Sequence, residues 1–265
     1  MSAVTTEPSH RSDAKKLAIR ELQSRVQGGL ETLDPAKIKD PFAGLLSKTN
    51  LLAALSIPIS TFNCTTQPGL GNTPTMTDPN ALWVGIGGVI PRWKKGSIVN
   101  FAAYAGGYPT PDMAVFAAYR LWYAAQAWNK ADVGVTFKWV TPLADAEFVL
   151  GYGGDGGSTL ARSFFPNSAD LNHLYVYKLA FDPKYLNYQT NIFEHELGHV
   201  IGLRHEFADQ EGGAVQWGPR NPNSVMSYVF PPQIQPSDVT YTKSFYDFNG
   251  HKIGTLNMQV LIPDN

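Results

Sequence analysis

The fold is decided by the stretch His195-Glu196-Leu197-Gly198-His199-Val200-Ile201-Gly202-Leu203-Arg204-His205. His195 and His199 are four residues apart, and on a helix this spacing places two imidazoles on one face, one turn apart. Gly202 tolerates the positive φ at which many helices end, so the chain can turn there and bring His205 back. The pattern therefore predicts a helix whose C-terminal end gathers three imidazoles around one metal ion.

The chemistry of these residue types indicates zinc and hydrolysis. Zinc binds neutral imidazole nitrogens in a tetrahedral arrangement, and a catalytic zinc keeps one position open for a water whose pKa falls to roughly 7. Glu196 follows the first histidine and can reach that water, so it is the candidate general base. The other interpretation of a bare HExxH is an amphipathic helix with incidental histidines. Gly202 and His205 in register favour the metal site.

The helix itself is predicted from its start signal and its apolar face. Asn191 is the expected N-cap, with Glu194 three residues later as its capping-box partner. Four apolar residues fall on one face by helical spacing: Phe193, Leu197, Val200 and Ile201. We expect this face to be buried while another side of the helix holds the metal.

A second motif, Ser224-Val225-Met226-Ser227-Tyr228, follows about twenty residues after the first. Together the two motifs resemble the metzincin superfamily of zinc endopeptidases. The resemblance implies that Met226 lies in a tight turn beneath the metal. It also implies that Tyr228 is an additional zinc ligand that swings away to stabilise the oxyanion, as in astacins and serralysins. This motif is more similar to serralysins, whereas Glu206 after the third histidine is similar to astacins, so neither branch fits cleanly.

The resemblance covers roughly residues 80–248 and implies an α+β zincin fold. We expect a twisted mixed sheet, a long active-site helix and a Met-turn. The run 161–166 resembles the substrate-binding edge strand of matrixins and their relatives, so an extended peptide would pair with the strand near residues 159–165. In astacins the residue matching Glu206 is buried and bonds a new N-terminus. The alternative is a surface glutamate paired with a nearby arginine.

Length and composition narrow the class of protein. The chain has 265 residues and a formal net charge of −1, so no basic stripe indicates nucleic acid, and no long apolar run indicates a membrane span. The single cysteine excludes an internal disulfide, which fits a reducing compartment. The first residues have no positive region and no apolar run, so the sequence as written predicts no secretory signal. We expect an intracellular or non-classically secreted protein.

The chain is expected to divide into an N-terminal extension, residues 1–79, and a catalytic domain, residues 80–265. The domain has an upper part, 80–203, and a lower part, 204–265. In the extension, 11–27 and 42–56 are predicted helices and 58–80 a linker or an extended segment. The predicted elements of the domain are strands at 97–104, 133–140, 146–152, 159–165 and 173–181, a helix from Pro111 to about Lys130 capped by Thr110, and a helix over 237–248.

Two further features stay open at this point. The glycine-dense run 153–157 is either a plain turn or a calcium site that uses Asp155 and backbone carbonyls, as related loops in matrixins do. Cys64 is either a buried or exposed cysteine without a role, or a latency switch, because in some metzincins a pro-segment cysteine fills the open zinc position. Its neighbours lack the arginine and glycine that flank the switch cysteine in matrixins. A third alternative is an extension that packs on the domain without inhibiting it.

These observations predict a zinc-dependent endopeptidase that hydrolyses peptide bonds of a peptide or protein substrate. The metal ligands would be His195, His199 and His205, with Glu196 as general base and Tyr228 as donor to the oxyanion. One alternative is a narrow-specificity processing peptidase for one partner or small peptide. Another is a non-catalytic zincin-fold binding protein, against which the intact Glu196 argues.

Overall fold

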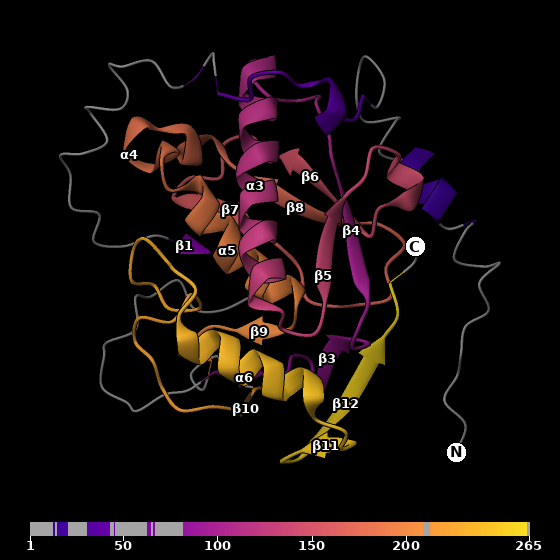
Figure 1. Cartoon of the computed structure of the whole chain (residues 1–265), viewed down its shortest axis with the longest axis vertical. Helices are drawn as coiled ribbons and strands as arrows, with labels where there is room; N and C mark the ends of the chain where they lie inside the picture. Colours follow the sequence, from indigo (N-terminus) through magenta and orange to yellow (C-terminus); the bar gives the residue numbers. More distant parts are fainter. Residues whose placement is uncertain are drawn as a thin grey trace.

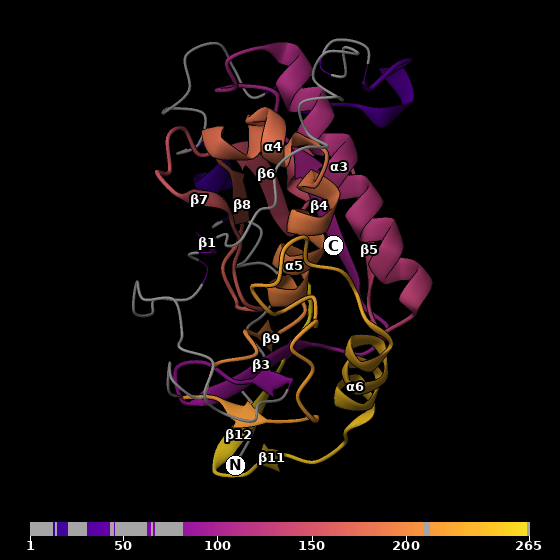
Figure 2. The same cartoon turned by 90° about the vertical axis from the view of Figure 1, so that its left-hand side faces the viewer.

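A six-stranded mixed sheet and two long helices form the centre of the molecule (Figure 1). The computed structural model describes residues 13, 15–20, 31–42, 45, 63–64, 66, 82–208 and 213–263. The helices α3 (Pro111–Ala131) and α5 (Gln189–Val200) pack against each other on one face of the sheet (Figures 1 and 2). The Trp128 indole donates to the Glu194 carbonyl at 2.9 Å where the two helices meet. This α+β arrangement confirms the predicted class.

The large sheet has the strand order β1-β7-β8-β6-β4-β5. Its strands are β1 (Asn63–Cys64), β7 (Thr159–Arg162), β8 (Asn172–Val176), β6 (Phe148–Tyr152), β4 (Ile98–Ala103) and β5 (Thr136–Trp139). Only β7 and β8 run antiparallel, and the other neighbours are parallel. The predicted strands exist with shorter bounds. The expected strand over 173–181 ends at Val176, because the chain continues as a 3-10 turn, η3 (Lys178–Phe181).

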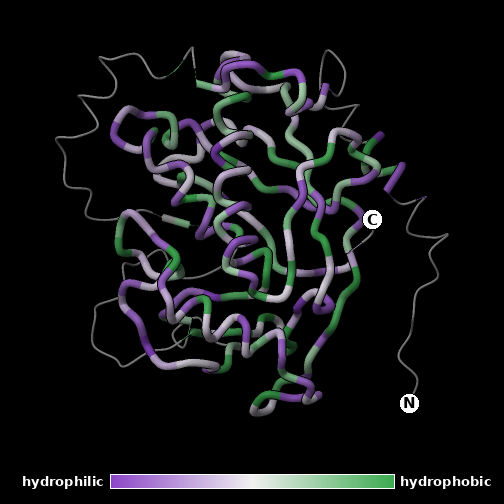
Figure 3. Tube along the Cα trace, in the orientation of Figure 1, coloured by the Kyte–Doolittle hydropathy of each residue, from purple (hydrophilic) through white to green (hydrophobic). Residues whose placement is uncertain are grey.

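The helix α3 forms where the sequence predicts it. Thr110 caps its first turn by accepting a hydrogen bond from the Met113 amide, and Pro111 occupies the first helical position, where no amide is needed. The helix ends at Asp132, which has a left-handed φ of 53°. Polar and apolar residues alternate along α3 with the helical repeat (Figure 3), and the apolar side is buried against the core.

The helix α5 begins two residues before the predicted cap. Its N-cap is Tyr188, which makes no side-chain cap bond, so the prediction of Asn191 as N-cap is wrong. The reason lies in the preceding chain. The short helix α4 (Pro183–Leu186) is capped by Asp182 and leads directly into α5, so the backbone is already turning when it reaches residue 189. The four apolar residues of the predicted inner face are all buried.

Gly202 ends the helical region as predicted. Its φ is +95°, and a Cβ at this position would lie 2.7 Å from the Pro91 carbonyl oxygen. Only glycine combines this backbone conformation with this close approach. The chain then continues as β9 (Leu203–Arg204), which carries the third histidine back towards α5.

The lower part of the molecule holds two small sheets and the helix α6, Pro236–Asp247 (Figure 2). One sheet joins β10 (Val215–Gln216), β2 (Trp83–Val84) and β9, and the other joins β11 (Lys252–Ile253), β12 (Leu256–Leu261) and β3 (Val89–Trp93). The helix α6 begins with a capping box between Gln235 and Asp238, one residue before the predicted start. Two short 3-10 turns, η1 (Pro35–Lys37) and η2 (Leu143–Asp145), complete the elements.

The described parts of the N-terminal extension pack on the rest of the chain. Thr32 forms an antiparallel bridge with Tyr104, and the Phe42 ring stacks on Tyr123 of α3. Residues 15–20 are helical within the predicted helix over 11–27. Most of the predicted helix over 42–56, the first ten residues and most of the 58–80 segment lie outside the described residues. Among the described helices, none is long and apolar enough to cross a membrane.

Candidate metal centre

Four buried side chains converge at the end of α5. The ligand atoms of Cys64, His195, His199 and His205 all lie within 4.8 Å of one another, and this group can hold a metal ion. Two of the histidines come from α5 and the third follows β9. The cysteine comes from β1 and lies 135 residues before His199 in the sequence. Within the part of the chain that the structure describes, no other group of three or more such residues is placed this way.

Backbone carbonyls hold two of the histidine rings so that Nε2 of each faces the group. His195 Nδ1 lies 2.7 Å from the Val225 carbonyl oxygen, and His199 Nδ1 lies 2.8 Å from the Leu203 carbonyl oxygen. A carbonyl only accepts, so each Nδ1 carries the proton and each Nε2 keeps its lone pair. His199 Nε2 lies 3.5 Å from the Cys64 sulfur. These orientations fit a divalent metal ion bound through Nε2 atoms.

Burial also sets the protonation of this group. It lowers the pKa of His195 to about 4 and lowers those of His199 and His205 well below the ordinary value, with the neighbouring histidines adding to the effect. The imidazoles are therefore neutral at pH 7, which is the form that binds a metal. Burial raises the pKa of the Cys64 thiol, and the nearby Glu196 carboxylate raises it further. A bound cation would favour the thiolate instead.

Glu196 lies beside the group with its side chain fully enclosed. It is 1% exposed, and its Oε2 accepts a hydrogen bond from the Thr66 hydroxyl at 2.8 Å. Burial raises the pKa of this carboxyl to about 7, while the hydrogen bonds from Thr66 and Cys64 lower it. A carboxyl with this pKa can both accept and release a proton near neutral pH. This is the property that the predicted role of Glu196 requires.

Met226 lies in a tight turn packed under α5. The Ser227 amide donates to the Ser224 carbonyl at 2.9 Å, which closes the turn, and the Met226 side chain is fully buried. A Cβ on Gly198 would lie 2.3 Å from the Met226 sulfur. The close approach of the turn to the metal-binding helix therefore depends on glycine between the two helical histidines.

Tyr228 lies next to the histidines but points its hydroxyl at the backbone of β1. Its ring centroid is 5.0 Å from that of His205, and its hydroxyl donates to the Cys64 carbonyl at 3.4 Å. Phe207 contacts both rings, stacked on His205 and with its centroid 4.6 Å from that of Tyr228. The structure thus places the predicted oxyanion donor at the edge of the group.

The sequence reasoning missed Thr66. Its hydroxyl donates to Glu196 and accepts from the Ser163 amide at 2.7 Å, so it joins the candidate base to the end of β7. Two residues earlier, β1 pairs in parallel with β7, with Cys64 opposite Ala161. The described residues 63, 64 and 66 therefore contact the metal group, the base and the sheet edge at once. A threonine in a Pro- and Thr-rich stretch gives no signal that would have identified this contact.

Glu206 is buried rather than on the surface. It is 6% exposed, and its Oε2 accepts from the Asn221 amide at 3.4 Å. Burial raises the pKa of this carboxyl to about 7, with the Asp238 carboxylate adding to the rise and Arg220 among the groups that lower it. The alternative of a surface glutamate is wrong, and Glu206 belongs to the polar network around the Met226 turn.

The glycine-dense run 153–157 forms a turn built around Asp155. One carboxylate oxygen of Asp155 accepts from the Gly157 amide at 3.0 Å, and the other lies 3.7 Å from the Lys178 ammonium. Both oxygens therefore have partners from the protein, which favours the plain turn over the calcium site.

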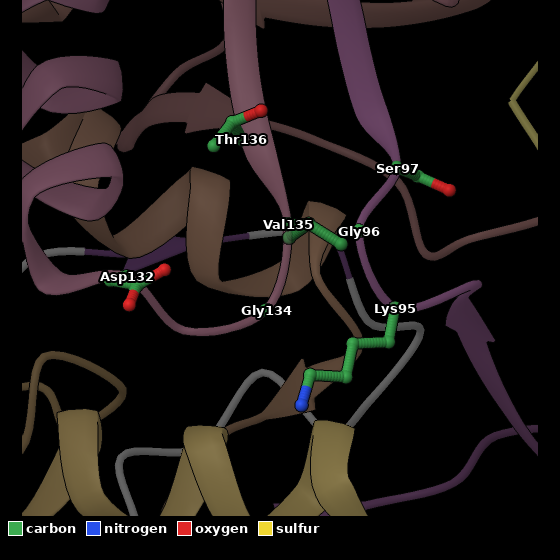
Figure 4. Close-up of a pocket in the computed structure, with 7 residues that line it drawn as sticks. All are labelled: Lys95, Gly96, Ser97, Asp132, Gly134, Val135 and Thr136. Atoms are coloured by element: carbon green, nitrogen blue, oxygen red, sulfur yellow. The ribbon is translucent and has the colours of Figure 1, made fainter.

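A separate pocket lies at the N-terminal ends of β4 and β5 (Figure 4). It is lined by residues 95–97 before β4, by residues 132, 134 and 135 between α3 and β5, and by Thr136 at the start of β5. The Lys95 ammonium forms an ion pair with Asp247 of α6 at the lower margin. None of these residues belongs to the metal group, and the pocket contains no histidine or cysteine, so the candidate chemistry stays with α5.

The structure brings together the residues that the sequence singled out. His195, His199 and His205 converge, and Glu196 and Tyr228 lie beside them. Neither a protein-family model nor a curated protein matches this chain at a significant level. The function is therefore inferred from the residues and their geometry.

Proposed function

We propose that this chain is a zinc-dependent endopeptidase of the metzincin type, and that residues 63, 64 and 66 hold it in a closed form. The observation that carries the proposal is the buried group of His195, His199 and His205 with Glu196 beside it. Three neutral imidazoles and an adjacent carboxyl are the residue types that a catalytic zinc hydrolase needs. The Met226 turn beneath α5 and the chain reversal at Gly202 support the metzincin type.

Each of the surrounding residues has a distinct role in this proposal. Zinc, when bound by the three histidines, supplies a Lewis acid and a water of lowered pKa. Glu196 takes the proton from the attacking water and delivers it to the leaving amine. In the closed form burial raises the pKa of this carboxyl to about 7, while the hydrogen bonds from Thr66 and Cys64, which β1 brings to it, lower it.

Tyr228 supplies the hydrogen-bond donor for the developing oxyanion. Its hydroxyl now donates to the Cys64 carbonyl, 3.4 Å away, and is released when β1 leaves. A substrate carbonyl that replaces this backbone carbonyl gives Tyr228 the same kind of acceptor. The expected substrate path is the edge of β7, where an extended peptide pairs with the strand as β1 does.

The closed form follows from the position of Cys64. Its sulfur lies among the three histidines, where a catalytic site keeps a position open for water. With zinc bound, the three histidines and the Cys64 thiolate would supply four ligands, which would leave no open position for substrate or water. We therefore expect the full-length chain to bind zinc and to have low peptidase activity until Cys64 is displaced.

The test combines metal analysis with cleavage-site profiling. Purified full-length protein should contain about one zinc per chain, as expected for a single three-histidine site. Treatment with a thiol-modifying reagent should release activity on a proteome-derived peptide library read by mass spectrometry. Glu196→Ala, treated in the same way, is the control for a contaminating peptidase. Zinc-loaded, thiol-modified protein that cleaves nothing in the library would contradict the proposal.

The second candidate function is a binding protein with a structural zinc site. The observation that favours it is the same cysteine, because four protein ligands without an open position are typical of structural zinc. Cys64→Ala separates the two candidates. An endopeptidase gains turnover in this variant, whereas a structural site loses zinc affinity and gains no activity. The number of sites cleaved then distinguishes a general endopeptidase from a narrow processing enzyme.

A further inference from the structure

Asp238 is a buried carboxylate that the proposed reaction does not use. It is the third residue of α6 and only 2% exposed. Its Oδ1 accepts from the Ser224 hydroxyl at 2.7 Å, and its Oδ2 accepts from the Val225 amide at 2.8 Å and the Gln235 amide at 2.9 Å. All three partners donate, so the carboxylate is satisfied as an acceptor. Two of these bonds hold the chain just before Met226.

These bonds fix both peptide planes next to Val225. The plane before Val225 is held directly, because its N–H donates to Asp238. The plane after Val225 contains the Met226 N–H, which donates to Ser224 Oγ at 3.0 Å. Since that oxygen accepts from Met226, its own proton is directed to Asp238. The carboxylate therefore sets the direction of the Val225 carbonyl through one direct bond and one bond through Ser224.

The Val225 carbonyl is the group that orients the first histidine of the metal group. Its oxygen lies 2.7 Å from His195 Nδ1, in a fully buried contact. This bond keeps the proton on Nδ1 and the lone pair on Nε2, and it fixes the plane of the ring. A carbonyl that is free to rotate would fix neither.

We infer that Asp238 is a positioning residue for metal binding, which acts on His195 through the Val225 peptide and Ser224. It does not touch the metal or the substrate. The inference rests on the proposed function only for the identity of the metal, since the orientation of His195 matters for any ion bound by the three histidines. Removing a direct hydrogen-bond partner of a metal ligand lowers metal affinity by about 10–100-fold, and Asp238 acts one step further out, so we expect an effect at the lower end of this range.

The alternative is that Asp238 only caps the N-terminus of α6 and has no effect on the metal group. It accepts from the Gln235 amide, which is one arm of the capping box, and a lost cap destabilises a protein without altering a distant ligand. Two variants separate the roles. Ser224→Ala removes the hydroxyl that joins Asp238 to the Met226 amide and leaves the cap of α6 intact. Gln235→Ala removes the Gln235 side chain from that cap and leaves the bonds that Asp238 accepts from Ser224 and from the Val225 amide.

The experiment measures zinc affinity of the full-length chain against a competing chromophoric chelator. We expect zinc binding to weaken by about tenfold in Asp238→Asn and by a smaller factor in Ser224→Ala. Gln235→Ala should bind zinc as the parent does. Tyr246→Phe is a second control, because it removes a buried hydrogen bond to the Ile201 carbonyl at the end of α5 without touching Val225. Thermal unfolding of each variant is recorded in parallel.

A second readout follows the ring itself. The ¹⁵N shifts of His195 in the metal-free chain should report the Nδ1–H tautomer in the parent and a mixture in Ser224→Ala. This readout does not depend on peptidase activity, so a parent that binds zinc but cleaves nothing even after thiol modification would contradict the proposed function and leave this inference standing. Equal zinc affinity in the parent and a folded Ser224→Ala and Asp238→Asn would overturn it. So would an equal loss in Gln235→Ala. If Asp238→Asn does not fold, Ser224→Ala decides alone.

Discussion

The two halves of the candidate site differ in how the chain builds them. The three histidines and Glu196 come from eleven consecutive residues, 195–205, and the helix and its glycine turn hold them together. Cys64 and Thr66 come from a segment about 130 residues earlier, and β1 reaches the site only by pairing with the edge of β7. The first half is held by local backbone geometry and a buried core. The second half is held by a two-residue strand and a few polar contacts.

Under the proposed function, this difference separates a permanent site, formed by residues 195–205, from a removable cover, formed by Cys64 and Thr66 with β1. α5 is packed against α3 and the sheet, and its histidines are oriented by backbone carbonyls of β9 and the Met226 turn. Removing β1 leaves every one of these contacts in place. An edge strand of two residues forms few ladder bonds, so its departure costs less free energy than unfolding the buried helix α5. The predictions below test the two halves in turn.

Glu196→Ala should have the largest effect on activity. We expect thiol-treated protein to lose activity by about three orders of magnitude or more. General base catalysis contributes about 10²–10⁴-fold, and we expect no neighbouring residue to take over the proton transfer. Zinc content should stay close to that of the parent, since Glu196 is not among the grouped ligands. Turnover and metal content are measured on the same sample. Retained activity in this variant would remove Glu196 from the mechanism.

Cys64→Ala should have the next largest effect, in the opposite direction. It removes the sulfur from the histidine group and opens the position that we expect water to take. Peptide cleavage should rise by about tenfold or more, which corresponds to about 1.4 kcal/mol of lost inhibition. A thiol-modifying reagent should activate the parent to a similar level and leave the variant unchanged. If neither the substitution nor the reagent changes cleavage, β1 is scaffold and the site is open in solution.

The site half that is local in sequence could be predicted in detail. The spacing of the two helical histidines, the positive φ of Gly202 and the return of His205 all follow from backbone geometry within one short stretch. The long helix α3 was predicted for the same reason, since Thr110 and Pro111 mark its start. These features need no knowledge of the rest of the chain.

The remaining features depend on contacts that are distant in sequence. The start of α5 was misplaced because α4 runs into it, and a cap signal at Asn191 does not reveal a helix that has already begun. Thr66 has no local pattern, since its partners Glu196 and Ser163 are about 130 and 97 residues away. The small strands β2, β3 and β9 are two to five residues long, too short for a periodic signal.

Tyr228→Phe tests the residue that contacts both halves. Its hydroxyl donates to the Cys64 carbonyl in the closed form and is the proposed donor to the oxyanion in the open form. The two effects oppose each other in the parent, so the substitution is best made together with Cys64→Ala. There we expect cleavage to fall by about 10–100-fold, less than for Glu196→Ala, because a donor is lost rather than the base. A larger loss than for Glu196→Ala would reverse the two roles.

Thr66→Val should have the smallest effect. It tests whether the Thr66 hydroxyl helps to hold β1 over the site. Valine keeps the shape of threonine but can neither donate to Glu196 nor accept from the Ser163 amide. A buried hydrogen bond to a charged group contributes about 1.5–3 kcal/mol, and part of this loss remains because Glu196 stays enclosed until β1 leaves. We expect basal cleavage to rise by a few-fold, up to about tenfold, with Cys64 intact.

Thr240→Val is the matched control, since the Thr240 hydroxyl donates only to the Pro236 carbonyl on the exposed side of α6. It should leave cleavage unchanged. In the Cys64→Ala background, Thr66→Val should add less activation than it does in the parent, because the sulfur no longer holds β1 in place. The two substitutions would be independent if their effects multiplied. That result would mean that Thr66 and Cys64 do not belong to one removable cover, and that Thr66 acts on Glu196 alone.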